Sequence, residues 1–425
     1  MRAFLGMAIY RLLLPMLFLV AFPGWLFKMA RRGGFGSGLR ERLSWYRTSP
    51  DYEPCGAVHL HAVSVGEALL ALKLMREWRK TSPDQKFVLA TGTSTGHAVA
   101  SESAFNDLCV VYAPLDFRWM VKRYLKRFEP GQIVLVEGEA WPNLLHECCR
   151  RAIPVRLVNA RVSPRSKRRY HRFAAWVRPV FSRLDQVAVQ EADDAEIWTE
   201  LGIPHHRIVV TGSLKFDPGS GVCPEPRFEF SEMLNRFGQN RAVVLAASTH
   251  AGEEVLIARA WRQACPSTLL AIVPRHAERR TEIQEELEKE GLEVILRSAI
   301  SQPLNPANSV FLIDSTGELR DWTAHADVVI IGKSFLGTGG QNPCEAVIAG
   351  KPVIFGTHME NFEPLATRLA ESGGCLRVAD PNDLPTALRR ALHRDRDLEI
   401  GITAARGTLA RHEGACARTV ALLKA

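Results

Sequence analysis

Short apolar runs rich in Val, Ile and Leu alternate along this chain with longer segments of helical periodicity. The runs form two series. The first series comprises residues 57–63, 86–92, 108–114, 132–138, 155–161, 186–192 and 207–213, and the second comprises residues 241–248, 268–274, 292–298, 309–315, 327–333, 351–357 and 375–380. Continuous apolar runs separated by helices are typical of parallel strands buried on both faces. The pattern predicts an α/β protein with two doubly wound parallel sheets.

A segment rich in proline and glycine, residues 216–226, separates the two series. Such a composition indicates a linker, and a chain of 425 residues with 46% hydrophobic residues is long enough for two cores. We therefore expect an N-terminal Rossmann-like domain over residues 33–217 and a C-terminal one over residues 218–425. Two such domains face each other across a cleft, which the carboxyl ends of both sheets can line.

The N-terminus carries an uncharged apolar run, Leu12–Phe27, between Arg11 and a basic cluster at residues 28–32. No small-residue cleavage site follows the run, so an uncleaved membrane anchor over residues 1–32 is expected rather than a signal peptide. The run is short for a straight span, and both a spanning and an interfacial helix fit it. The basic cluster predicts that the rest of the chain stays on the cytoplasmic side.

The charge balance favours an anionic partner, because the net charge is +8 and the sequence pI is about 9.1. The densest basic run, Arg161–Arg172, fits a solvated face, acidic lipid headgroups or substrate phosphates, and the neighbouring anchor favours a membrane over nucleic acid. The nine cysteines show no C-x-x-C spacing, which argues against a zinc framework and against a disulfide scaffold.

The stretch HAVSVGE at residues 61–67 places a strand, a tight turn and a helix start in sequence. Ser64 and Glu67 have the S-x-x-E spacing of a capping box, in which each side chain satisfies a backbone N–H of the first helical turn. Because the turn follows the carboxyl end of a strand, Glu67 is also placed where a general base can act. Both interpretations remain open from this segment alone.

Residues 337–356 form the most informative loop on physical grounds. The two glycines at 339–340 let the backbone approach a ligand, Asn342 suits a helix N-cap and Pro343 suits the first helical position. Such a helix N-terminus can bind phosphate or carboxylate. Glu345 is either a capping partner of this helix or an acceptor of ribose hydroxyl hydrogen bonds. Walker, G-x-G-x-x-G, H-E-x-x-H and G-x-S-x-G patterns do not occur at these sites.

Taken together, these stretches resemble the 3-deoxy-D-manno-octulosonic acid (Kdo) transferases, membrane-anchored glycosyltransferases of the GT-B fold that act in lipopolysaccharide biosynthesis. The matching pieces follow in order from residue 61 to residue 362: HAVSVGE, TGTSTG, APLD, EGEAWPNL, NARVSPRS, GSLKFD, ASTHAGEE, VPRHAER, DSTGEL, GGQNPCEA and FGTHMENF. The resemblance covers nearly the whole chain, the anchor included.

The resemblance implies that Kdo moves from CMP-Kdo to a hydroxyl of a lipid A precursor, lipid IVA, with inversion at the anomeric carbon. It implies neither a cofactor nor a metal ion, and it places the enzyme at the cytoplasmic face of the inner membrane. In the first domain it makes Glu67 the catalytic base and Glu139 a second functional carboxylate, with Glu137 beside it. The acceptor-binding residues that it implies are Ser64, Gly66, Thr93, Ser94, Asn159, Arg161, Ser163 and Arg165.

In the second domain the resemblance implies a binding site for CMP-Kdo, with Arg275 as a positive clamp, Asn342 in a phosphate cradle and Glu345 on the ribose. The full set of donor-binding residues is Ser248, Thr249, Arg275, His276, Gly317, Glu318, Lys333, Ser334, Gly340, Gln341, Asn342 and Glu345.

Two positions depart from the family pattern. Gln341 stands where the family has histidine, and it keeps a donor and an acceptor but carries no protonic charge. Lys333 stands where glycine is common, and it adds a cation near the phosphate or the Kdo carboxylate. Two other functions compete with the Kdo transferase: a GT-B transferase that uses a UDP-sugar on a lipid, and a non-catalytic scaffold that binds anionic lipids.

Overall fold

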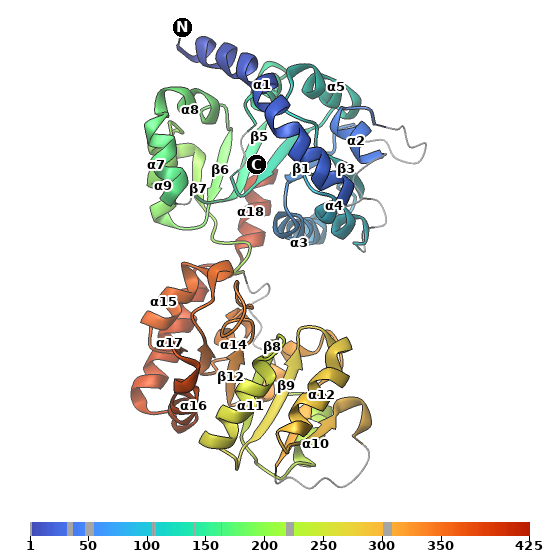
Figure 1. The fold of residues 1–425 in the computed structure, drawn as a ribbon. Helices are drawn as coiled ribbons and strands as arrows, with labels where there is room; N and C mark the ends of the chain where they lie inside the picture. The colour runs from blue at the N-terminus through green and yellow to red at the C-terminus, as the bar shows by residue number, and fades with distance from the viewer. Residues whose placement is uncertain are drawn as a thin grey trace. The chain divides into compact units, whose positions relative to one another are not determined.

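The computed structural model describes residues 2–31, 37–46, 55–103, 105, 108–138, 141–162, 164–217, 225–300 and 308–425. Contacts divide the chain into two compact units (Figure 1). The first unit contains Met1–Asp217 and Gly414–Ala425, and the second contains Pro218–Glu413.

The first unit contains, within its described residues, a sheet of seven parallel strands in the order β3-β2-β1-β4-β5-β6-β7. The strands are β1 (Val58–Ala62), β2 (Phe87–Thr91), β3 (Cys109–Tyr112), β4 (Gln132–Val136), β5 (Val155–Ala160), β6 (Gln186–Val189) and β7 (Ile208–Val210). The central strands are buried on both faces, which explains their continuous apolar sequence. The predicted doubly wound sheet is confirmed.

Helices cover both faces of this sheet. They are α2 (Ser37–Arg42), α3 (Val65–Thr81), α4 (Ser94–Ser101), α5 (Arg118–Phe128), α6 (Pro142–Arg150), α7 (Pro164–Arg172), α8 (Ala174–Phe181), α9 (Ala192–Glu200) and the 3-10 helix His205–Arg207. One core cluster packs α3 against β1, and another packs α5, α6 and α9 against the opposite face.

The second unit repeats this architecture. Its described residues form a seven-stranded parallel sheet in the order β10-β11-β9-β8-β12-β13-β14. The strands are β8 (Val243–Thr249), β9 (Leu269–Pro274), β10 (Glu293–Leu296), β11 (Ser309–Leu312), β12 (Val328–Ile331), β13 (Val353–Phe355) and β14 (Cys375–Arg377). Every strand of this unit coincides with an apolar run that the sequence pattern predicts.

The helices of the second unit are α10 (Phe228–Asn235), α11 (Glu253–Ala264), α12 (Arg280–Lys289), α13 (Leu319–His325), α14 (Cys344–Ile348), α15 (Leu365–Glu371), α16 (Leu384–His393) and α17 (Arg396–Ala410), with 3-10 helices at Ala277–Arg279, Arg297–Ala299, Glu360–Phe362 and Pro381–Asp383. They cover the sheet as the alternation of strands and helices predicts.

The last helix, α18 (Ala415–Lys424), departs from the expected domain division over residues 218–425. It packs on α3 of the first unit, where Ala415 and Leu423 join the core. The Asp217 carboxylate accepts the N–H groups of Gly414 at 3.1 Å and Cys416 at 2.6 Å. The C-terminal residues therefore complete the first unit, because their apolar face is buried there.

The first helix, α1 (Arg2–Arg31), extends on both sides beyond the expected apolar run and continues through Arg11. Its segment Gly6–Gly24 has a mean hydropathy of 1.7 and only 6% of it is buried within the protein. Among the described residues this helix alone is long and apolar enough to cross a membrane, by length and composition. This agrees with the predicted anchor.

The apolar periodicity after Gly66 predicts that Ala68, Leu69, Leu72 and Met75 of α3 face inward, and this is wrong for one of the four. Ala68, Leu72 and Met75 are buried as expected, but Leu69 is 53% exposed. Leu70 is buried instead, because the buried face of the helix is wide and also includes Ala71 and Leu74.

Candidate active site

The order of strands in the first sheet reverses between β1 and β4. In open α/β sheets, ligands bind outside the carboxyl ends of the strands at this switch point. Helix α3 begins directly after β1, and Glu137 follows β4. These two loops therefore form the candidate site of the first unit.

Glu67 lies in the first turn of α3, and it is 8% exposed. The Val63 N–H donates to Oε2 at 2.8 Å, and the Ser64 hydroxyl donates to Oε1 at 2.8 Å. The Glu67 N–H donates in return to Ser64 Oγ at 3.2 Å. Ser64 is thus the N-cap that the sequence predicts, although the carboxylate extends to the residue before the cap.

The environment of Glu67 raises the pKa of its carboxyl. Burial raises the pKa of the carboxyl above its ordinary value of 4.5, while hydrogen bonds from Val63 and Ser64 lower it and the charge of Glu137 raises it. A carboxylate with a raised pKa is a better acceptor for the proton of a substrate hydroxyl. The capping geometry fixes where this carboxylate is held.

The turn before α4 lies against the turn before α3. Thr93 caps α4 by accepting the Gly96 N–H at 3.1 Å. A Cβ on Gly96 would lie 3.4 Å from the Ser64 carbonyl oxygen, so the two turns are in close contact. Ser94 is partly exposed and Gly66 is exposed at this edge. The structure thus brings together four of the predicted acceptor residues.

Asn159 lies near the carboxyl end of β5, and Arg161 follows the strand at the same edge. Asn159 is buried at a positive φ of 53°, and its Oδ1 accepts the Leu214 N–H at 2.9 Å. Its Nδ2 donates to Glu137 Oε1 at 3.5 Å, whereas the Arg161 side chain is exposed. Asn159 therefore positions the chain and Glu137, and Arg161 remains available to a ligand.

Two predicted residues, Glu139 and Ser163, lie outside the described residues. Arg165 belongs to α7, but its side chain is likewise outside the description.

The switch point of the second sheet lies between β8 and β12. Ser248, near the end of β8, has a φ of 55°. A Cβ on Gly332 would lie 2.3 Å from the Ser248 carbonyl oxygen, so only glycine fits where the two strand ends meet. This close approach brings Lys333 next to the loop that follows β8.

A buried glutamate that the sequence did not single out organises this edge. Glu253, at the start of α11, is fully buried, and its carboxylate accepts three backbone N–H groups. The donors are His250 at 3.1 Å, Lys333 at 2.6 Å and Phe335 at 3.1 Å. Glu253 thus joins the loop after β8 to the loop after β12.

The neighbouring Glu254 is fully buried as well. Its Oε1 accepts the Thr249 hydroxyl at 2.8 Å and Arg279 Nη1 at 2.8 Å. The predicted donor-binding hydroxyl of Thr249 is therefore engaged within the protein. The repeated acids of STHAGEE were a signal for this network, but two of their partners, Arg279 and Lys333, lie 25 and 80 residues away in sequence and were not predicted.

Gln341 contacts a histidine from the loop after β8. Its Nε2 lies 3.0 Å from His250 Nε2, and the ring of His276 lies edge-on to His250 with centroids 6.3 Å apart. Burial and the charge of Lys333 lower the pKa of His250, which favours a neutral ring. Arg275 and His276 are exposed at the same strand end. Of the predicted donor-site residues, Gln341, His276 and Lys333 therefore lie close to His250, and Arg275 follows β9 at the same edge of the sheet.

The glycine loop packs against residues 358–361. Gly340 has a φ of 66°, and a Cβ there would lie 2.5 Å from Met359 Sδ. The helix expected after Asn342 starts one residue later than predicted, at Cys344, and contains five residues. Asn342 Oδ1 accepts the Cys344 N–H at 3.0 Å, so its side chain stabilises the turn before the helix instead of serving as the N-cap.

Two of the remaining donor-site candidates, Ser334 and Glu318, make side-chain contacts within the protein. Ser334 is fully buried, donates to the Ile331 carbonyl at 2.6 Å and accepts the Gly356 N–H at 2.9 Å. Glu318, preceded by Gly317 at a φ of 85°, pairs with Arg297 at 2.6 Å.

Glu345 is exposed. Within the described part of the chain no residue donates a hydrogen bond to its carboxylate, so the predicted capping partnership with Asn342 is not formed.

Among the residues that the structure describes, no three or more His, Cys, Asp or Glu side chains are grouped to hold a metal ion.

Comparison with known proteins identifies the family to which this chain belongs. Residues 37–218 match the family model described as 3-deoxy-D-manno-octulosonic-acid transferase (kdotransferase). A 3-deoxy-D-manno-octulosonic acid transferase of Haemophilus influenzae is 32% identical over 91% of this chain and 90% of its own. The protein of that name from Bordetella pertussis is 32% identical over 94% of this chain and 95% of its own.

Solved structures match the fold. MurG of Acinetobacter baumannii aligns with a TM-score of 0.56 at 14% identity, over 87% of this chain and 99% of its own. The UDP-GlcNAc 2-epimerase of Neisseria meningitidis aligns with a TM-score of 0.53 at 14% identity, over 87% of this chain and its whole own length. At this identity they bear on the fold alone, and they confirm the predicted GT-B class.

Proposed function

Because this chain belongs to the 3-deoxy-D-manno-octulosonic acid transferase family, we propose that it transfers Kdo from CMP-Kdo to lipid IVA, a lipid A precursor. Family membership makes the protein a glycosyltransferase of lipopolysaccharide biosynthesis, and the donor, the acceptor and the residue roles are the proposal. The observation that carries it is the Glu67 carboxylate, held at the switch point of the first sheet with a raised pKa.

In the proposed reaction Glu67 is the general base. Its carboxylate takes the proton of the acceptor hydroxyl while that oxygen bonds to the anomeric carbon of Kdo, and the bond from that carbon to the phosphate oxygen breaks. CMP leaves with the electron pair, and the configuration inverts. The Val63 N–H and the Ser64 hydroxyl hold the carboxylate in position.

The second unit supplies the donor site in this proposal. Arg275, His276 and Lys333 neutralise the phosphate of the leaving CMP by charge and hydrogen bonds, without a metal ion. Gly340 and Asn342 border the same loop, and the exposed Glu345 accepts hydrogen bonds from the ribose. We assign Ser334 and Thr249 to the framework of this site, because their hydroxyls are engaged within the protein.

We place the enzyme at the cytoplasmic face of the inner membrane, with α1 as its anchor. The hydropathy of Gly6–Gly24 and the basic cluster at residues 28–32 support this location. Arg161 and the cations of α7 are suitably charged for the phosphates of the lipid acceptor.

The test is an assay of the full-length protein in detergent with lipid IVA, CMP-Kdo and EDTA, in which mass spectrometry follows the lipid. Wild type should add whole Kdo units, and Glu67→Gln should add none while its thermal unfolding stays normal. Glu77→Gln, on the same helix but paired with Lys80, is the matched control and should retain activity. An active Glu67→Gln would exclude the base, and transfer from a UDP-sugar alone would exclude the donor.

A further inference from the structure

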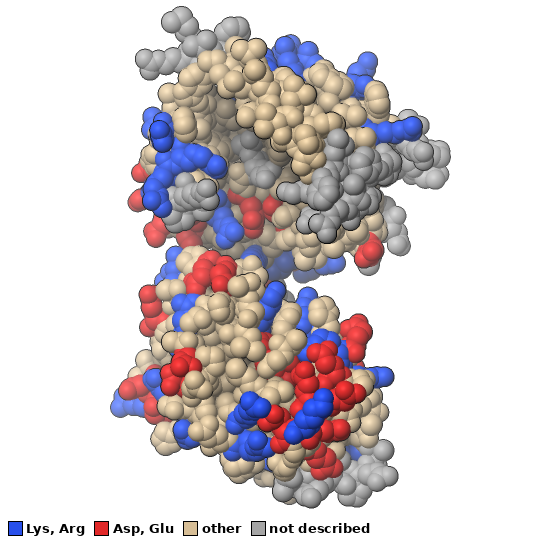
Figure 2. Space-filling model, in the orientation of Figure 1, with Lys and Arg blue, Asp and Glu red and all other residues tan. Residues whose placement is uncertain are grey.

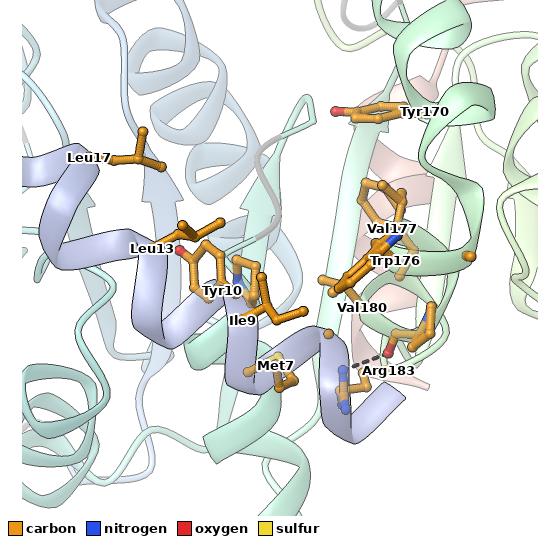
Figure 3. A pocket seen from close by; sticks show the side chains of 15 residues that line it. Met7, Ile9, Tyr10, Leu13, Leu17, Tyr170, Trp176, Val177, Val180 and Arg183 are labelled. Carbon is orange, nitrogen blue, oxygen red and sulfur yellow. Dashed lines mark hydrogen bonds between the residues drawn. The ribbon is translucent and has the colours of Figure 1, made fainter. Parts of the chain in front are cut away.

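An apolar pocket of about 340 Å³ lies between α1 and α8 in the first unit (Figure 3). Apolar side chains of both helices line it, among them Ile9, Leu13, Leu17, Trp176, Val177 and Val180. Figure 3 shows Ile9 and Leu13 on the α1 side, facing Trp176 and Val180 on the α8 side. Its volume falls within the usual range for small-molecule sites, about 300–1,000 Å³.

The pocket is continuous with an exposed apolar surface. Leu13 and Leu17 line it, and their neighbours Leu12, Met16 and Val20 are exposed on the same helix. This stretch of α1 is the segment that can enter a membrane. An apolar patch of this kind needs a partner, and a chain that lies in the bilayer beside α1 can reach the pocket without crossing water.

Polar contacts connect α1 to the segment between β3 and α5 and to the first turn of α6, the helix that comes after β4. The Tyr10 hydroxyl donates to Asp116 at 2.9 Å, and Arg11 Nε donates to Asn143 Oδ1 at 2.9 Å. Asp116 also accepts the N–H groups of Asn143 and Leu144, each at 2.9 Å, in the first turn of α6. Pro142 begins this helix and lines the pocket. One end of the pocket is therefore fixed to the switch-point edge of the sheet.

The surroundings of the pocket are positively charged. Arg183 lines it, and α7 contributes exposed Arg168, Arg169 and Arg172. In Figure 2 the positive side chains over α7 lie beside an uncharged surface over α1. An occupant with an apolar chain and an anionic head matches both features.

We propose that this pocket holds one acyl chain of the lipid acceptor, so that the enzyme recognises the lipid part of its substrate as well as the sugar. The inference rests on the proposed function. The chain enters along α1, the phosphates of the head lie near α7 and Arg183, and Pro142 places the sugar next to the loop of Glu137. The pocket is thus a specificity site for acylated acceptors.

The first experiment compares two neighbouring leucines of α1 in the full-length enzyme. Leu13→Trp fills the pocket, and Leu12→Trp places the same side chain outside it. The acceptors are lipid IVA and its fully deacylated glycan, with CMP-Kdo saturating. For Leu13→Trp the ratio of the glycan KM to the lipid IVA KM should fall by about tenfold, the loss expected for about two buried methylene groups. For Leu12→Trp the ratio should equal that of wild type.

Val177→Trp fills the pocket from the opposite wall and should repeat the Leu13→Trp result. The proposal would be overturned if the ratio of the glycan KM to the lipid IVA KM were the same in Leu13→Trp, Val177→Trp and Leu12→Trp as in wild type. So would a loss of binding by Leu13→Trp to phosphatidylglycerol vesicles that contain no acceptor, because the pocket would then serve bulk lipid.

A second measurement does not depend on turnover. Lipid IVA carrying a photoactivatable diazirine at the end of one acyl chain is cross-linked to the full-length protein, and the adducts are mapped by mass spectrometry. Adducts within residues 6–17 and 175–181, absent in Leu13→Trp and present in Leu12→Trp, support the pocket. Adducts elsewhere overturn it. If wild type forms these adducts but transfers no Kdo, the proposed function has failed and the lipid pocket stands.

Discussion

Glu67 and Glu253 occupy equivalent places in the two units, and the protein uses them differently. Each follows the first strand of its sheet and begins the next helix. Glu253 is fully buried, and three backbone N–H groups from two loops bond to it. Glu67 accepts one backbone N–H and one hydroxyl, both from the turn just before it.

The difference lies in how far each carboxylate is saturated by hydrogen-bond donors. A carboxylate saturated by backbone donors stabilises loops and has little capacity left for a substrate. A carboxylate with two local donors is fixed in place but can still accept a proton. The number and origin of its donors, rather than its position after a strand, therefore separate the structural glutamate from the proposed catalytic one.

The largest expected effect is on turnover at the first of these glutamates. Glu67→Gln should lower kcat by about 10²- to 10⁴-fold, the usual contribution of a general base. Circular dichroism and thermal unfolding should match wild type. A kcat within a few-fold of wild type would assign Glu67 to capping alone.

The corresponding substitution at Glu253 should lower the stability of the protein rather than act directly on turnover. Glu253→Gln replaces one acceptor oxygen by a donor that faces backbone N–H groups, so it should lower the free energy of unfolding by about 1–3 kcal/mol. Denaturant titration with a tryptophan signal from the second unit, which contains Trp261 and Trp322, measures this loss. If Glu253→Gln left the free energy of unfolding unchanged but abolished turnover, Glu253 would have a catalytic role and the distinction between the two glutamates would be wrong.

The acid limb of the pH profile sharpens the assignment of Glu67. In the proposed mechanism the active form of Glu67 is the carboxylate, so log kcat/KM should fall by one unit per pH unit below the pKa of Glu67. Because burial raises that pKa, the limb should lie above pH 4.5. Glu137→Gln removes a neighbouring negative charge and should move the limb to lower pH. A limb at or below pH 4.5 in wild type would contradict the raised pKa.

The smallest expected effect concerns Lys333, whose backbone N–H donates a hydrogen bond to Glu253. Lys333→Ala removes a side chain near the proposed phosphate while its backbone N–H still bonds to Glu253. The KM for CMP-Kdo should rise by up to about fivefold, the size of a partly solvated ion pair. The rise should shrink with added salt, and an unchanged apparent affinity would exclude Lys333 from the donor site.

The sequence predicts the sheets well because the evidence for each buried parallel strand is local. Every strand coincides with an apolar run, and the S-x-x-E spacing locates both the cap and the proposed base. Glu253 was not predicted as a loop organiser, since two of its partners, Lys333 and Phe335, lie about 80 residues away in sequence. The shift of the helix start from Pro343 to Cys344 depends on one side-chain bond of Asn342, which spacing alone does not determine.

The return of α18 to the first unit affects how the protein is made. The second unit is, in topology, an insertion between Asp217 and Gly414. At about 5–20 residues per second, a ribosome needs roughly 10–40 s to synthesise residues 218–413 after it has passed Asp217. The core of the first unit can therefore be completed only after α18 has left the ribosome, long after α1 has become available to the membrane, although all seven strands of its sheet precede Asp217.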